Sequence, residues 1–262
     1  MLSSSTILMS SHSIDRNSLF FRNLPSDFRL GEDAAQLRLF QEYGSVFVAR
    51  GGAIAPNKVV FKNEEEVAAF QSELEVSQFE ISGYTLQLQA AAANALLNAI
   101  AEGKRAGLSI TPRGADSARR NYNDTIELWR SRVEPALVHW VRNGRLDDDQ
   151  AEKIRSLSPY EQVPEVFALE EHGIYFAKDL SKSIIYSVAP PGASQHLSML
   201  AFDVAEFDDL KVRAILAKHH WYQTVTSDLP HFTFLGVEEN ELPELGLRSI
   251  VNSDREFWVP AI

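Results

Sequence analysis

The stretch Ser194-Gln-His-Leu-Ser-Met-Leu-Ala-Phe-Asp203 and the shorter stretch Asp228-Leu-Pro-His-Phe232 decide the fold of this chain. The first contains a β-like run at 199–204, and the second leads into another at 231–235. A helical pattern lies between them at 208–219. Short strands next to helices predict an α+β fold, in which a small antiparallel sheet carries both stretches and is flanked by helices.

Residues 1–80 are expected to form a lead-in and a small N-terminal appendage. Residues 1–33 are polar and aperiodic, as loosely held termini are. Asn63 followed by Glu66 is the pattern of a capping box at the start of a helix. The expected elements are a hairpin of residues 45–50 and 58–62, a helix near 64–75 and a strand at 78–81.

Residues 81–262 are expected to form the main domain, with a helical insertion at about 120–182. Runs rich in Ala and Leu, apolar residues at helical spacing and closing glycines mark the helices. The expected helices are 86–105, 116–142, 147–157 and 164–171, and the expected strands before the first stretch are 108–111 and 183–188.

The composition is that of an ordinary globular protein, with 262 residues, 45% hydrophobic and 23% charged. A net charge of -11 argues against a protein that binds nucleic-acid phosphates. The absence of cysteine excludes disulfides, Cys-based zinc sites and thiol nucleophiles. No run approaches about 18 apolar residues, so no transmembrane segment is expected. The Ser-rich start lacks the basic and apolar regions of a signal peptide.

The two stretches offer the donor set of a catalytic zinc site. His196, Asp203 and His231 would be three protein ligands beside an open position for water, and Asp228 would be a nearby base. The spacing alone is weak support, because chance places an acid seven residues after about one histidine at this composition. The chain has three such pairs. The other two are His172 with Asp179 and His231 with Glu238.

The residues around the candidate ligands are more specific. Ser194, His196, Ala201 and Asp203 are similar to the motif Ser-x-His-x-x-Gly-x-Ala-x-Asp of the zinc peptidases of bacterial cell-wall peptides, with Met199 at the glycine position. That family includes D-alanyl-D-alanine carboxypeptidases and dipeptidases and L-alanyl-D-glutamate endopeptidases. The segment 228–232 resembles the second motif in its endopeptidase form, Asp-x-Pro-His-Phe. The resemblance covers roughly residues 85–120 and 183–236.

The resemblance implies a zinc-dependent peptidase acting on peptidoglycan-type stem peptides, at a D-Ala-D-Ala or an L-Ala-D-Glu bond. It implies that the two histidines and Asp203 hold Zn2+ and that Asp228 is the general base. Arg113 resembles the family's arginine in position, and would hold the substrate and stabilise the oxyanion. Ser194 would support the site by a hydrogen bond. A protein of this family would act in the periplasm or outside the cell.

Each of these assignments has an alternative. The three candidate ligands would also fit as polar residues at the ends of buried strands, Asp228 as a turn residue, and Arg113 as a solvated loop residue or the partner of Asp116. Met199, the weak context of Arg113 and the insertion favour a second hypothesis, a catalytically silent module that binds cell-wall peptides or a partner. A third is a zinc amidase or peptidase with another class of substrate. The oligomeric state stays open.

Overall fold

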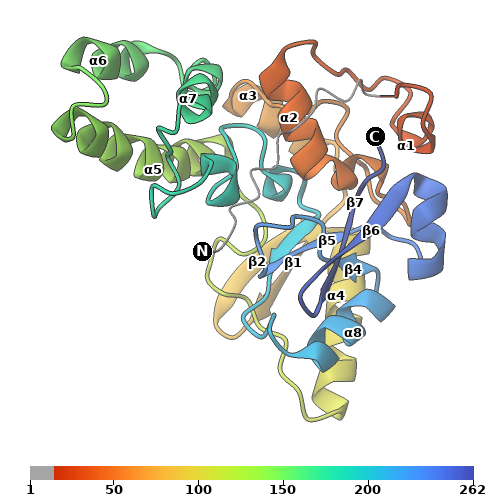
Figure 1. Ribbon diagram of the computed structural model, residues 1–262. Coiled ribbons are helices and arrows are strands. Elements are labelled where there is room, and N and C mark those ends of the chain that lie inside the picture. Colours follow the sequence, from red (N-terminus) through yellow and green to blue (C-terminus); the bar gives the residue numbers. More distant parts are fainter. Residues whose placement is uncertain (1–14) are drawn as a thin grey trace.

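The computed structural model describes residues 15–262, which form helices and three small antiparallel sheets (Figure 1). The predicted α+β class, a small sheet with flanking helices, is confirmed.

The central sheet contains the strands β3 (Ala201–Asp203), β5 (His231–Phe234) and β4 (Trp221–Tyr222), in the order β3-β5-β4. Phe202 pairs with Phe232, and because side chains alternate along a strand, both lie on one face. Helix α8 (Leu210–Lys218) packs against β4, and α4 (Ala90–Arg105) lies beside α8 (Figure 1). The other face carries the Asp203–His231 pair and is the face of interest for function.

Two hairpins accompany this sheet. One joins β1 (Val76–Ile81) to β2 (Tyr84–Gln89) through Ser82 and Gly83, which both have positive φ. The other joins β6 (Leu247–Asn252) to β7 (Arg255–Pro260) and follows the 3-10 helix η4 (Glu239–Leu245). The strand at 78–81 is confirmed within β1, and the expected helix at 86–105 is wrong at its start, because residues 86–89 belong to β2.

The N-terminal part corrects one prediction. No hairpin forms from 45–50 and 58–62. Residues 44–48 are the 3-10 helix η1, and Lys58 forms only an isolated bridge to Arg29. The run Val46-Phe-Val48 is wholly buried, and an apolar run buried on all sides has no periodicity that separates strand from helix. The described helices of this part are α1 (Leu19–Asn23), α2 (Ala34–Tyr43) and α3 (Glu64–Ser72).

Helix α3 begins where its cap predicts. The side chain of Asn63 accepts a hydrogen bond from the backbone N–H of Glu66. Glu66 does not return the bond to Asn63, and instead accepts from the backbone N–H of Lys62. The predicted helix near 64–75 is therefore confirmed, with half of the capping box present.

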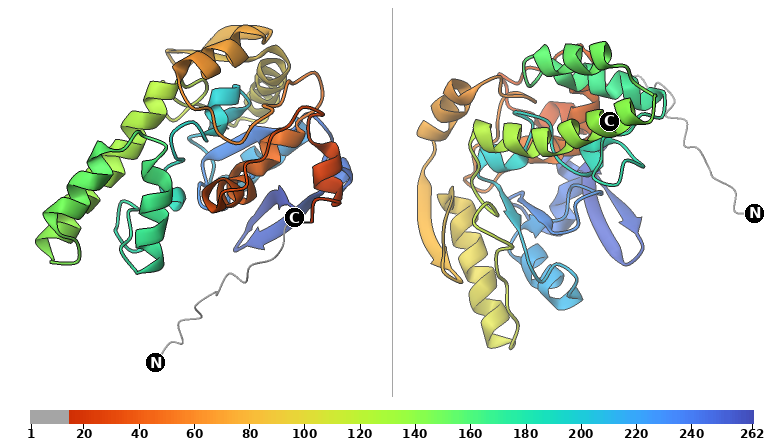
Figure 2. Two further views of the ribbon diagram at one scale, coloured as in Figure 1. Left: turned by 90° about the horizontal axis from the view of Figure 1, so that it is seen from above. Right: turned by 90° about the vertical axis from the view of Figure 1, so that its left-hand side faces the viewer.

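The predicted helical insertion contains α5 (Tyr122–Arg142), α6 (Asp148–Ser156) and α7 (Gln162–Glu171). Figure 2 shows these helices on one side of the molecule, away from α4 and α8. Helix α5 begins at 122 rather than 116, because Asn121 and Asp124 form a complete capping box. The β-like run 183–188 is instead the 3-10 helix η2 (Ile184–Tyr186), and 108–111 forms no strand.

The core is shared by both parts of the chain. One cluster of buried side chains contains Phe40 and Phe47 from before residue 80 and Trp129, Phe202 and Trp258 from after it. The division into 1–80 and 81–262 stays a prediction. Among the described residues, no helix is both long and apolar enough to cross a membrane.

Candidate metal centre

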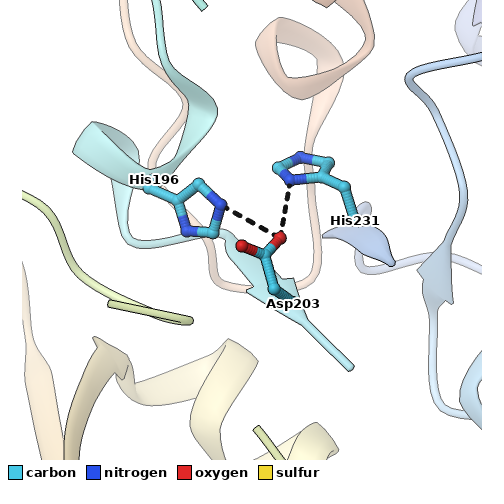
Figure 3. Close-up of side chains that lie close together, drawn as sticks. All are labelled: His196, Asp203 and His231. Atoms are coloured by element: carbon cyan, nitrogen blue, oxygen red, sulfur yellow. Dashed lines mark hydrogen bonds and ion pairs between the residues drawn. The ribbon is translucent and has the colours of Figure 1, made fainter. Parts of the chain in front are cut away.

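Three side chains converge on the polar face of the central sheet (Figure 3). Asp203 and His231 are register partners on β3 and β5, which places their side chains next to each other. His196 comes from the 3-10 helix η3 (Gln195–Ser198), just before β3. Oδ1 of Asp203 lies 3.3 Å from Nε2 of His196 and 3.2 Å from Nδ1 of His231. The sequence therefore identified three residues that the fold brings together.

The tautomer of His196 follows from its buried partner. Its Nδ1 lies 2.7 Å from the backbone carbonyl oxygen of Ala118, which can only accept a hydrogen bond. Nδ1 therefore carries the proton, and in the neutral ring the Nε2 that faces Asp203 is bare.

The tautomer of His231 is set by Gln195. The amide nitrogen of Gln195 donates to the backbone carbonyl of Tyr43 at 2.9 Å, which fixes the orientation of the amide. Its Oε1 then accepts from Nε2 of His231 at 2.9 Å and from the hydroxyl of Thr233 at 2.5 Å. In the neutral His231 ring, the Nδ1 that faces Asp203 is bare.

When both rings are neutral, these two nitrogens and Oδ1 of Asp203 are three acceptor atoms that face one another. That arrangement is repulsive unless a proton or a metal cation lies among them. In a tetrahedral zinc site with bonds of about 2.0–2.1 Å, neighbouring ligand atoms are about 3.3 Å apart, which is close to the two distances from Asp203 Oδ1 to the histidine nitrogens. All three ligand atoms lie within 4.8 Å of one another. Both rings also donate their far nitrogen to an oxygen, as metal-bound histidines do. This donor set fits a divalent metal ion.

The charge states agree with that fit. Burial, followed by the nearby charge of Arg120, lowers the pKa of His196, which favours the neutral ring that a metal requires. Burial alone would raise the pKa of Asp203, but charge and hydrogen bonds from the imidazoles in their protonated form outweigh burial and hold this pKa well below its usual value, so Asp203 is an ionised carboxylate. The candidate ligand set is two imidazoles and one carboxylate.

Arg120 is a member of the site that the sequence did not single out. Its Nη2 lies 3.1 Å from Oδ2 of Asp203, the carboxylate oxygen not shared by the histidines, and 3.3 Å from the carboxylate of Asp116. The contact holds Asp203 in one orientation and leaves Oδ1 for the shared point. Arg120 is therefore a positioning residue.

Met199 stands where the sequence motif has glycine. It follows η3 in the left-handed conformation, with φ 59° and ψ 29°. Glycine is favoured in that conformation because it has no Cβ. Here a methionine accepts it, with its side chain buried to 1% exposure. The left-handed turn between η3 and β3 is thus formed by a methionine.

The converging side chains lie in the wall of a cavity of about 410 Å3. Arg113, Asp228 and Ser194 line the same cavity. The backbone N–H of Arg113 donates to the carbonyl of Asp203, and that of His231 to the carbonyl of Asp228, so both residues are tied to the ligands through the main chain. Within the described residues, no hydrogen bond or ion pair joins the side chain of either one to the three ligands.

Ser194 is buried at the start of η3. Its hydroxyl makes no hydrogen bond to another described residue, so its supporting role stays a prediction. The orientation of the ligands comes instead from Gln195, from the Ala118 carbonyl and from Arg120. Gln195 is adjacent to a candidate ligand, which is a weak signal, whereas a backbone carbonyl leaves no trace in a sequence.

Comparisons with known proteins add no constraint. No family model matches the chain, and no curated protein or solved structure matches it significantly. The chemistry assigned to the cavity therefore depends on its geometry.

Proposed function

We propose that the protein is a zinc-dependent hydrolase of peptide bonds. The observation that supports this most is the meeting of two bare imidazole nitrogens and one carboxylate oxygen in the wall of a cavity that Asp228 and Arg113 also line. Two neutral ligands and one anion leave a bound divalent ion with net positive charge. When bound, zinc supplies a Lewis acid and lowers the pKa of a bound water to about 7.

Asp228 is the proposed general base. Its side chain is exposed at the cavity, three residues before His231, and its main chain is held by a turn. In this role its carboxylate accepts a proton from the attacking water and donates it to the leaving amine.

Arg113 is the proposed electrophilic group. It lines the cavity from the segment that bridges to β3 through Pro112 and Val204. It forms no ion pair with another described residue, so its guanidinium is available for the carbonyl oxygen of the scissile bond. Its charge would then stabilise the developing oxyanion.

The proposed substrate is a peptidoglycan-type stem peptide, cleaved at a D-Ala-D-Ala or an L-Ala-D-Glu bond. The two sequence motifs support this class, and Asp228-Leu-Pro-His231-Phe232 favours the second bond. The cavity has the size of a small-ligand site, for which about 300–1,000 Å3 is usual. This function would place the protein in the periplasm or outside the cell.

A second candidate function is a catalytically silent module that binds such peptides. The Arg120–Asp203 ion pair favours this second function, because Arg120 can hold the Asp203 carboxylate in place without a metal. The peptide would then bind in the cavity without being cleaved.

The hydrolase and the silent module are distinguished by measuring whether the zinc-loaded protein hydrolyses L-Ala-D-Glu and D-Ala-D-Ala peptides. The hydrolase predicts turnover that falls about 100- to 10,000-fold in Asp228→Asn with zinc content unchanged. Asp179→Asn is the matched control, an exposed acid outside the cavity. Binding without cleavage by the wild type would contradict the hydrolase and favour the module.

A further inference from the structure

We infer that Arg132 forms an anion subsite in this cavity, and that the substrate carries a carboxylate away from the bond that is cleaved. This inference rests on the proposed function and names the chemistry of its substrate. Arg132 lies on α5, in the helical insertion, and not on the elements that hold the metal ligands.

The side chain of Arg132 is oriented but not neutralised. Its Nε donates to the hydroxyl of Ser187 at 2.8 Å, and its Nη1 donates to the hydroxyl of Ser131 at 2.9 Å. Its Nη2 makes no hydrogen bond to a described residue. No carboxylate of the described part lies within 4.0 Å of its nitrogens, whereas Arg38, Arg120, Arg155, Arg213 and Arg255 all form ion pairs. A half-buried guanidinium held by two serines is prepared for an anion that the chain does not supply.

Helix α5 presents Arg132 to the cavity. Thr125, Leu128 and Arg132 are three and four residues apart, which places them on one face of the helix, and all three line the cavity. Tyr186 and Ser187, at the end of η2, complete this wall. The insertion therefore builds a wall of its own, with a cation in it.

The charges of the cavity favour an anionic ligand. Its acidic lining residues, Asp116, Asp203 and Asp228, are matched by three arginines. Asp116 and Asp203 are both engaged by Arg120, so Arg113 and Arg132 keep their charge for a ligand. The six charges of the lining balance, so a bound divalent metal would give the cavity a net positive charge. In a chain with net charge -11, that local charge together with the two unpaired arginines would select an anion.

Peptide pairs that differ only in one carboxylate test the inference. The pairs are L-Ala-D-Glu against L-Ala-D-isoglutamine, and D-Ala-D-Ala against its C-terminal amide. Dissociation constants are measured by calorimetry on the zinc-loaded Asp228→Asn protein, in which turnover is expected to be about 100- to 10,000-fold slower. A charged hydrogen bond contributes enough to predict about a 10- to 100-fold preference for the carboxylate in at least one pair.

Variants of residues on α5 then show whether Arg132 causes this preference for the carboxylate. Arg132→Gln is expected to reduce the carboxylate preference to below about threefold. Arg132→Lys is expected to keep part of the preference, because lysine retains the charge but not the paired N–H donors of the guanidinium. Arg130→Gln is the matched control and is expected to keep it, since Arg130 is exposed on the same helix outside the cavity. Circular dichroism checks that every variant is folded.

The subsite is overturned if Arg132→Gln keeps the preference for the carboxylate. It is also overturned if the protein with Arg132 intact binds acid and amide equally, or if neither pair of peptides binds. The proposed function fails separately. If no peptide is cleaved but the preference depends on Arg132, the anion subsite stands and the hydrolase does not. Cleavage that is indifferent to both the carboxylate and Arg132 leaves the hydrolase and removes the subsite.

Discussion

At the scale of single residues, the candidate centre depends on where two protons sit. The Ala118 carbonyl and the Gln195 amide oxygen each accept a hydrogen bond from one imidazole. In the neutral rings, the nitrogen that faces Asp203 therefore carries no proton. The three candidate ligands were predictable as a group, because they stand in two sequence motifs, and the fold brings them together. Gln195 and Arg120 were not, since their contacts join residues 36 and 83 positions apart in the chain.

Gln195→Met tests this account of the tautomers. The substitution nearly keeps the volume but removes the acceptor of His231 Nε2–H, so zinc affinity is expected to fall about 10- to 100-fold. Competition with a chromophoric chelator measures the affinity. The control is Gln162→Met, which loses the bond from the Trp129 indole to Gln162, outside the cavity. Equal zinc affinity in wild type and Gln195→Met would refute the assignment.

Met199 allows a second test at this scale. Both Met199→Ala and Met199→Gly lose the buried side chain, but only glycine relieves the left-handed backbone. The glycine variant is therefore expected to be more stable than the alanine variant by about 1 kcal/mol in urea unfolding. At Ser198, in η3 with no positive φ, the order should reverse. A Met199→Ala protein that is the more stable one would contradict this explanation of the motif.

At the scale of elements, some helix caps and β-rich runs could be recognised in the sequence, whereas the degree of burial of a segment could not. Asn63 and Asp147 cap helices through their own side chains, and both helices were expected close to where they begin. Asn121 caps α5 in the same way, but the helix was expected to start at 116, so this cap was missed. The strands β3 and β5 were expected from their β-rich runs. The false hairpin at 45–50 arose because η1 is buried on all sides. The β6–β7 hairpin went unrecognised, as did α2.

The η2 wall of the cavity is held by a buried carboxylate. Glu170, on α7, accepts from the hydroxyl of Ser183 and from the backbone N–H of Ile184, and lies 3.7 Å from Arg38 on α2. Burial raises the pKa of Glu170, although these three partners lower it in part. The network ties α7, in the insertion, to the start of η2, which leads to Ser187, an acceptor for Arg132.

The raised pKa predicts a pH dependence. The folded state binds the Glu170 proton more tightly than the unfolded state, whose ordinary pKa is 4.5. The stabilisation from this group is present below that value and is lost as pH rises through the raised folded pKa. Relative to Glu170→Gln, the wild type should therefore be more stable at pH 4 than at pH 7. Urea unfolding at both values measures it, and a difference that is constant or larger at pH 7 would contradict the prediction.

At the scale of the whole molecule, the candidate centre joins segments that are distant in sequence. Residues of η3, β3 and β5 supply the ligands, and the 118–120 segment before α5 orients two of them. Such a site is complete only in the folded chain, so metal binding should stabilise folding.

The expected size of this stabilisation can be stated. Zinc at about 1,000 times its dissociation constant would add about 4 kcal/mol, which raises the melting temperature on the order of 10 °C for a chain of this size. Scanning calorimetry with and without zinc measures the shift. Asp203→Asn should abolish it, while Asp179→Asn, outside the cavity, should retain it. A shift of equal size in both variants would indicate zinc bound elsewhere.

The proposed metal centre requires one zinc ion per chain, and the zinc content of the purified protein measures this. The protein is purified without added metal, equilibrated with zinc, dialysed, and measured by mass spectrometry together with His196→Gln and His231→Gln. The account predicts one zinc ion per wild-type chain and a content near zero in both variants. A wild-type content that stays near zero after zinc addition, or an equal content in the variants, would contradict it.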